Sequence, residues 1–225
     1  MILVPVKNLA DAKQRLSSVL NSDERIALAQ AMCEDVLQVL ASWQGRPEVA
    51  VVTSDPFARN LAERFNFEVI ADDNSGETSA IEMATAFCQA RGAESTLVVP
   101  ADIPLIDSSE LQQIVDNAPA GGTVLVPDAA GRGTNAAWRA PADLFPLRFG
   151  NDSFKPHHAA AQATNKPCVV LRLAGIAVDV DSPEDLQHLV SLPGETRAQQ
   201  LARKWGIGPR VGRALLPAQP RSGDL

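Results

Sequence analysis

The chain has 225 residues, of which 45% are hydrophobic and 21% are charged, so it can bury the core of a folded domain and is not intrinsically disordered. Its formal net charge of -7, without a basic stripe, argues against nucleic-acid binding, because neutralisation of phosphates dominates that affinity. No apolar run approaches the roughly 20 residues that span a bilayer, and the short apolar N-terminus lacks the pattern of a signal peptide. We therefore expect a cytoplasmic protein that binds neither nucleic acid nor a membrane.

Apolar runs of strand length alternate with segments of helical periodicity in the first half of the chain. The expected strands are Ile2–Val6, Val49–Val52, Glu68–Ala71, Thr96–Val99 and Thr123–Val126. The expected helices are Asp23–Leu40, Pro56–Phe65, Thr78–Ala90 and Ser108–Asn117. Ser22 or Asp23 is the expected N-cap of the first helix, and Ser108 or Ser109 is that of the last. This alternation predicts an α/β fold with a mostly parallel sheet that is flanked by helices on both faces.

The second half of the chain predicts a less regular continuation of the sheet. After a glycine turn at Gly121, the strands come closer together in the sequence, which allows an antiparallel pairing. Cys168–Leu173 and Ile176–Val180 are the next expected strands. Ser182 is the expected N-cap of a helix whose first residue is Pro183.

Composition also predicts how the chain is divided. We expect a single domain over residues 1–207, because no internal repeat or linker interrupts them. Residues 208–225 are rich in Pro, Gly and Arg and are expected to form a mobile C-terminal extension.

Cations gather directly after the first expected strand. In an open α/β sheet, ligands bind beyond the carboxyl ends of the strands, and Lys7, Lys13 and Arg15 follow such an end. Three cations on one strand-to-helix loop suit a triphosphate, although a solvated helix face would have the same composition. No glycine-rich phosphate loop accompanies them.

Carboxylates follow two of the expected strands. Asp102 comes after Thr96–Val99, where a buried carboxylate needs a partner or a metal ion. Asp179 and Asp181 end another strand, and the alternation of side chains would direct both to one face. A turn or cap role is the alternative for each of them. We favour Asp102 and Asp179 as ligands of a divalent cation and Asp181 as a structural partner.

Two glycine-containing loops are candidates for binding an anion through backbone N–H groups. They are 131–135, which includes Thr134, and 148–154, which includes Gly150 and Ser153. Each is equally compatible with an ordinary surface loop. The following His157 and His158 are expected at the surface, because no third ligand at a suitable spacing supports a zinc site.

Together these segments resemble one family of enzymes. The segments are Val4–Lys7, Ala12–Leu16, Ala101–Leu105, Gly133–Asn135, Arg148–Gly150, Asp152–Ser153, Asp179–Leu186 and Gly206–Pro209. In this order the set resembles the guanylyltransferases of coenzyme F-420 biosynthesis, which use 2-phospho-L-lactate or, in bacterial relatives, phosphoenolpyruvate. The resemblance implies a single-domain, Rossmann-like nucleotidyltransferase fold of the type shared with molybdenum-cofactor guanylyltransferases and GT-A enzymes. It also implies GTP as donor, pyrophosphate as leaving group and Mg²⁺ as cofactor.

The resemblance also implies roles for particular residues. Asp102 and Asp179 would bind Mg²⁺ and, with Lys13, carry catalysis; Thr134, Gly150 and Ser153 would hold the phosphorylated acid; Lys7, Lys13 and Arg15 would face the triphosphate. Where the family often has a Leu-Asn pair, this chain has Glu77–Ala80, so Thr78 or Ser79 would contact the nucleotide instead.

Several alternatives stay open at this point. Phosphoenolpyruvate is the first choice of acceptor, and 3-phospho-D-glycerate and 2-phospho-L-lactate remain candidates. A related nucleotidyltransferase, a GT-A glycosyltransferase or a non-catalytic nucleotide-binding regulator would share parts of the pattern. The sequence does not determine the oligomeric state, and a homodimer is compatible with it.

Overall fold

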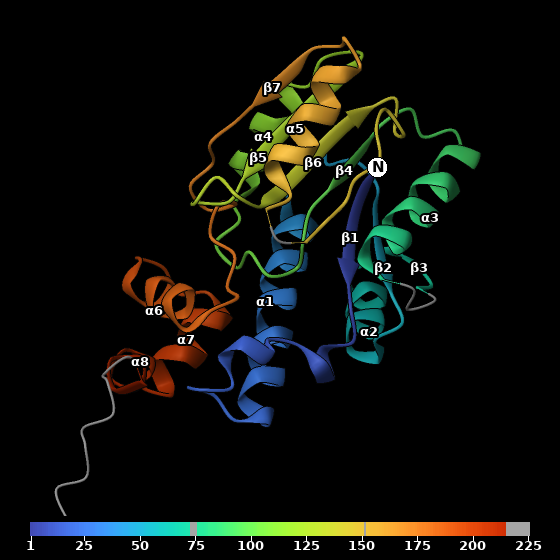
Figure 1. Cartoon of the computed structure of the whole chain (residues 1–225). Coiled ribbons are helices and arrows are strands. Elements are labelled where there is room, and N and C mark those ends of the chain that lie inside the picture. The colour runs from blue at the N-terminus through green and yellow to red at the C-terminus, as the bar shows by residue number, and fades with distance from the viewer. Residues whose placement is uncertain (73–75, 151, 215–225) are drawn as a thin grey trace, which may run out of the picture.

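One mixed β-sheet organises the molecule (Figure 1). A computed structural model describes residues 1–72, 76–150 and 152–214 of the chain. Within them, seven strands pair in the order β3-β2-β1-β4-β6-β5-β7. The strands are β1 Ile2–Val6, β2 Val49–Thr53, β3 Glu68–Ile70, β4 Thr96–Val98, β5 Gly122–Pro127, β6 Thr134–Ala140 and β7 Cys168–Val170. β6 is antiparallel to β4 and β5, whereas the other neighbouring strands are parallel.

Helices cover both faces of this sheet, as the sequence predicted. The α-helices are α1 Ser22–Ser42, α2 Pro56–Arg64, α3 Glu77–Ala90, α4 Ser108–Asp116, α5 Phe154–Ala163, α6 Pro183–Ser191, α7 Arg197–Lys204 and α8 Ile207–Ala214. Two short 3-10 helices, η1 Leu9–Asp11 and η2 Gln14–Leu16, follow β1. The predicted α/β class with a mostly parallel mixed sheet is confirmed.

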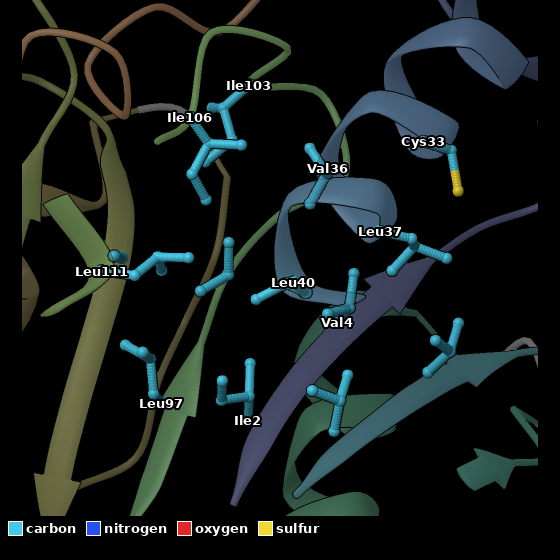
Figure 2. Packing of buried hydrophobic residues seen from close by; sticks show 14 of the residues in the cluster. Ile2, Val4, Cys33, Val36, Leu37, Leu40, Leu97, Ile103, Ile106 and Leu111 are labelled. Carbon is cyan, nitrogen blue, oxygen red and sulfur yellow. The ribbon is translucent and has the colours of Figure 1, made fainter. Parts of the chain in front are cut away.

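Alternation along β1 divides the core into two layers. Ile2 and Val4 point to one face, where they pack against Val36, Leu37 and Leu40 of α1 (Figure 2). This layer also includes buried residues of α2 and α4. Leu3 points to the other face and belongs to a second layer with buried residues of α3 and α5. Because β1 is buried on both faces, its continuous apolar sequence is typical of a central parallel strand.

A third cluster joins the C-terminal helices to the outer face of α1. Figure 1 shows α6, α7 and α8 gathered beside α1 and away from the sheet. Leu28 and Met32 of α1 are buried there together with Ile207 and Val211 of α8. The domain boundary expected between residues 207 and 208 therefore falls inside a packed helix, because α8 needs Val211 to complete its apolar face. Residues 215–225 of the expected extension lie outside the described residues.

Helix capping was predicted correctly at one of three positions. Ser182 caps α6 in a capping box with Asp185, and Pro183 is its first residue, as expected. α1 is instead capped by Asn21 in a capping box with Glu24, and α4 is capped by Asp107. In both wrong predictions the true cap is the Asn or Asp that precedes the serine, because its side chain reaches the backbone N–H groups of the first turn.

One predicted strand is absent and one strand was missed, among the described residues. In place of the expected strand Ile176–Val180, residues 176 and 177 lie in a turn and residues 178–180 have no regular secondary structure. The backbone N–H groups of Gly175 and Ile176 donate to the carboxylate of Glu110 in α4, which satisfies them outside any sheet. β6 was missed because its sequence lacks a clear apolar alternation and includes Arg139, which is nevertheless buried.

No helix in the described part of the chain is long and apolar enough to cross a membrane. The cytoplasmic location stays a prediction.

Candidate functional site

Two cavities meet at the carboxyl ends of the central parallel strands. The first cavity has a volume of about 560 Å³ and lies against the loop after β1, the start of α3 and the segment after β4. The second cavity has a volume of about 440 Å³ and lies against the loops before β6 and α5 and the segment before α6. Asp181 lines both cavities, so it marks the place where they adjoin.

Lys13 stands at this junction and joins two carboxylates. Its Nζ atom lies 2.7 Å from Oδ2 of Asp102 and 2.7 Å from Oδ1 of Asp181. Burial alone would lower the pKa of Lys13, but the charges and hydrogen bonds of the two aspartates outweigh it and raise the pKa. The side chain is only 9% exposed and is a fixed cation, which suits contact with an anionic substrate.

The backbone at Lys13 is held in an uncommon conformation. Its φ of 56° and ψ of 39° lie in the left-handed region, which a residue with a Cβ adopts at some cost. Lys13 separates η1 from η2, and this turn directs its side chain back over the end of β4. Strain of this kind is common at functional sites, where the surrounding contacts maintain it.

Asp179 lies on the side of the second cavity. Its Oδ1 accepts a hydrogen bond of 3.0 Å from Nδ2 of Asn135, which also donates to the carbonyl of Ile176. Burial, followed by the negative charges of Asp102 and Asp181, raises the pKa of Asp179 to about 6 despite that hydrogen bond. The three carboxylates therefore share a region of negative potential that a cation would relieve.

The structure shows how the residues of this acidic group are connected. Asp181, the expected structural partner, forms an ion pair with Lys13, and the alternative role as a helix cap belongs to Ser182. Asp102 is joined to Asp181 through Lys13 rather than directly to Asp179. Among the described residues, no three Asp, Glu, His or Cys side chains converge closely enough to form a metal site by themselves. The assignment of Asp102 and Asp179 as metal ligands stays a prediction.

The predicted nucleotide contacts are distributed between the two cavities. Lys7 and Lys13 line the first cavity, whereas Arg15 lines the second. α3 contributes Glu77 to the wall of the first cavity, and the expected Thr78 and Ser79 are not part of that wall. Nζ of Lys7 lies 3.1 Å from Oε2 of Glu77, so an ion pair closes this end of the cavity.

The predicted acid-binding loops lie together beside the second cavity. Gly133 and Gly150 line it, and the buried Thr134 and Ser153 lie behind the same wall. The backbone N–H of Thr134 donates to Oγ of Ser153 over 3.1 Å, which ties the two loops together. Asp128 braces the first loop by accepting hydrogen bonds from the backbone N–H groups of residues 132 and 133. Of the three predicted acid-binding residues, Gly150 lines the second cavity, whereas Thr134 and Ser153 are buried next to residues that line it, and their role stays a prediction.

His157 contradicts its predicted place at the surface. The side chain is 1% exposed on the inner face of α5, whereas the neighbouring His158 is half-buried and stacks on Phe154. Burial, and then the charge of Arg139, lower the pKa of His157 to about 4, so the ring is neutral near pH 7. The spacing of four residues between His157 and the buried Ala161 is the signal in the sequence that would have indicated an inward-facing position.

A family model and several known proteins match most of this chain in sequence. A family model described as "Guanylyl transferase CofC like" matches residues 1–214. A phosphoenolpyruvate guanylyltransferase of Sphaerobacter thermophilus is 34% identical over 187 residues, which cover 83% of this chain and 90% of that protein. A 3-phospho-D-glycerate guanylyltransferase of Colwellia psychrerythraea is 30% identical over 85% of this chain and 91% of its own length. A 2-phospho-L-lactate guanylyltransferase of Methanobrevibacter smithii is 29% identical over 84% of this chain and 82% of its own length.

Solved structures agree with the fold alone, because their sequences are distant. A Desulfovibrio desulfuricans protein described as a nucleotide-diphospho-sugar transferase has a TM-score of 0.76 and 18% identity, covering 95% of this chain and 96% of its own. A nucleotidyl transferase from Methanothermobacter has a TM-score of 0.59 and 17% identity, covering 91% of this chain and 99% of its own. The fold, the two adjoining cavities and the match over residues 1–214 lead to one conclusion: the chain belongs to the CofC-like guanylyl transferase family, a family of nucleotidyltransferase enzymes.

Proposed function

We propose that the protein transfers GMP from GTP to a small phosphorylated three-carbon acid and releases pyrophosphate, as a step in coenzyme F-420 biosynthesis. Three acids are candidate acceptors, because relatives named for each of them match most of the chain: phosphoenolpyruvate, 3-phospho-D-glycerate and 2-phospho-L-lactate. Phosphoenolpyruvate is preferred, since the relative named for it has the highest identity of these three, 34%. The observation that carries the proposal is the junction of two cavities at Asp181, where Lys13 binds both Asp102 and Asp181. Such a junction suits a reaction between two ligands that must meet end to end.

The larger first cavity is the proposed site of GTP. Its inner end carries Lys13 and Asp102, next to the junction, and would hold the α-phosphate. Its outer end carries the ion pair of Lys7 with Glu77 and would hold the nucleoside. This orientation is required by the chemistry, because only the α-phosphate has to reach the acceptor.

The second cavity is the proposed site of the acid. Five aspartates line it together with Arg15 and Arg132, so these two arginines would have to supply the positive charge for a phosphate and a carboxylate. Gly133 and Gly150 bring backbone close to the ligand, which suits contacts between N–H groups and an anion.

The residues at the junction fit a hard divalent cation. Carboxylate oxygens are the ligands that Mg²⁺ prefers, and burial, with a smaller contribution from the negative charges of Asp102 and Asp181, raises the pKa of Asp179. Asp102 and Asp179 would hold the ion, with Asp181 fixed by Lys13 next to them. An ion bound there would offset negative charge on the phosphates.

The proposed reaction is a direct displacement at phosphorus. A phosphate oxygen of the acid forms a bond to the α-phosphorus of GTP, while the bond from that phosphorus to the oxygen bridging to the β-phosphorus breaks and pyrophosphate leaves. The attacking oxygen is already an anion, so no residue has to remove a proton. The work of the protein is to align the two ligands and to neutralise charge, for which Lys13 is the best-placed cation among the described residues.

The decisive experiment incubates the purified protein with GTP, MgCl₂ and each of the three acids. We expect pyrophosphate release together with a product whose mass equals the acid plus GMP minus one water, most rapidly with phosphoenolpyruvate. Asp102→Asn should remove most of this activity, whereas Asp23→Asn, on the exposed side of α1, should not. No consumption of GTP with any of the acids would refute the proposal. Release of a nucleoside diphosphate from a nucleotide sugar would point to a glycosyltransferase instead.

A further inference from the structure

We propose that His157 is a positioning residue that fixes the acid-binding wall of the second cavity by joining Thr134 to the backbone of the 148–150 loop. This inference rests on the proposed function, because it assigns the second cavity to the acid. Its consequence is specific: loss of the imidazole should weaken use of the acid and leave use of GTP intact.

Both ring nitrogens of His157 are engaged with this wall. Nε2 accepts a hydrogen bond of 2.8 Å from the backbone N–H of Arg148, two residues before the cavity-lining Gly150. Nδ1 lies 2.9 Å from Oγ1 of Thr134, at the start of β6 and next to the cavity-lining Gly133. One side chain on α5 therefore connects two loops that are otherwise separate in the sequence.

The chemistry of these partners determines the tautomer of the ring. A backbone N–H can only donate, so Nε2 of His157 carries no proton. A neutral ring then has its proton on Nδ1, which donates to Oγ1 of Thr134. The hydroxyl of Thr134 accepts from the ring, and its own hydrogen stays available for an acceptor other than His157. His157 thus sets the direction in which Thr134 can donate.

Neighbouring contacts make the wall rigid around this histidine. Nη1 of the buried Arg139 donates to the carbonyl of Phe145 over 2.7 Å and holds the base of the same loop. The backbone N–H of Phe154, at the start of α5, donates over 2.7 Å to the carbonyl of Arg132. The second of these bonds joins α5 to the loop before β6, and the imidazole of this histidine adds the link from α5 to the backbone N–H of Arg148.

The network stays on the acid side of the site. None of its residues lines the first cavity, whose wall comes from the loop after β1, the start of α3 and the segments that carry Asp102 and Asp181. His157 is also too deeply buried to touch a ligand in the second cavity. Its role is therefore to position other groups, and its effect should be confined to the acid.

The test compares Michaelis constants for the two substrates. His157→Phe keeps an aromatic ring but loses both hydrogen bonds, and we expect it to raise the KM for the acid roughly tenfold or more, since small displacements of a binding wall are costly. The KM for GTP should stay within about twofold of the wild-type value. His158→Phe is the matched control, since it changes the adjacent histidine, which stacks on Phe154 and does not bind Thr134. We expect it to leave both constants unchanged.

Conservative variants separate the two hydrogen bonds and guard against a folding defect. His157→Gln can place an amide oxygen near Arg148 N, and His157→Asn can place an amide N–H near Thr134, so each should recover part of the loss. Thr134→Val should raise the KM for the acid as His157→Phe does. The double variant His157→Phe/Thr134→Val should have a KM for the acid no higher than that of the poorer single variant.

The inference is overturned if His157→Phe leaves the KM for the acid unchanged, or raises both constants in parallel. It is also overturned if neither conservative variant recovers function while both remain folded by circular dichroism. These outcomes are distinct from failure of the proposed function, in which the wild-type protein itself would consume no GTP.

Discussion

Nζ of Lys13 lies 2.7 Å from Oδ1 of Asp181, although the two residues are 168 positions apart in the chain. This contact joins the loop after β1 to the segment that leads into α6, at the junction of the two cavities. Asp102 adds a third chain segment to the same ammonium group. The junction is therefore assembled from distant parts of the sequence around a single cation.

Replacement of this cation should abolish most of the activity. We expect Lys13→Met to lower kcat by a factor on the order of 10² to 10³. The substitution removes a fixed positive charge from the junction, where negative charge develops on the phosphates during the transfer. Initial rates of pyrophosphate release measure the effect. Lys155→Met, an exposed position on α5, is the control and should keep full activity. A Lys13→Met enzyme with a wild-type kcat would contradict the role of Lys13.

Removal of divalent cations should stop turnover reversibly. EDTA is expected to abolish pyrophosphate release, and excess MgCl₂ should restore it, because the carboxylates at the junction otherwise repel the triphosphate. Asp102→Asn should in addition shift half-maximal activation to a higher concentration of MgCl₂, which a titration of rate against MgCl₂ would detect. Unchanged turnover in EDTA would exclude the proposed magnesium site.

A side chain at position 133, in the loop beside the second cavity, should weaken binding of the acid. A Cβ on Gly133 would lie 2.9 Å from Oδ2 of Asp128, which braces the loop through two backbone N–H groups. We expect Gly133→Ala to raise the KM for the acid several-fold, because the brace must move. Gly208→Ala has open space around its Cβ and should leave the KM unchanged. Equal constants for the two variants would show that the brace is dispensable.

Glu77, at the outer end of the first cavity, is expected to contribute to the preference for guanine over other bases. A carboxylate can accept from both N1–H and the 2-amino group of guanine, and Glu77 is the carboxylate of the pair that closes this end. We expect Glu77→Gln to reduce the preference for GTP over ITP, which lacks the 2-amino group, by roughly tenfold. The ratio of kcat/KM for the two nucleotides measures this preference, and Glu94→Gln provides a control remote from the cavity wall. An unchanged ratio would assign the base contact to another residue.

The free energy of unfolding should decrease as the pH is lowered, and His157 should account for part of this decrease. The pKa of His157 is about 4 in the folded protein, whereas an unperturbed histidine, as in the unfolded chain, has a pKa of 6.5. As the pH falls, the unfolded chain therefore binds the proton first. The free energy of unfolding should therefore fall between pH 6.5 and pH 4, by roughly 3 kcal/mol in total. Urea unfolding at a series of pH values should show a smaller pH dependence for His157→Phe than for His158→Phe. Identical slopes would mean that His157 is charged in the folded protein or is not buried.

Local patterns in the sequence were sufficient for the framework of the sheet. The continuous apolar run of β1 and the periodicity of α1 predicted those elements correctly, because burial on one or two faces imposes a characteristic spacing. The start of α6 was equally predictable from Ser182 and Pro183, since a cap acts within one turn. Even the candidate loops around Thr134 and Ser153 could be named from their composition, and they proved to be neighbours.

Contacts between distant segments decided the features that the sequence could not predict. The expected strand Ile176–Val180 does not form, because its backbone N–H groups find partners outside the sheet: Ile176 donates to Glu110 of α4, and Val180 donates to the carbonyl of Asp102. Asp181 is part of the junction because Lys13 reaches it across the sheet edge. The sequence by itself determined which residues carry charge and which segments are apolar, and these depend on short-range spacing. Only the tertiary structure decided which charges meet and which polar side chains, such as His157, are enclosed, because both depend on packing between residues far apart in the chain.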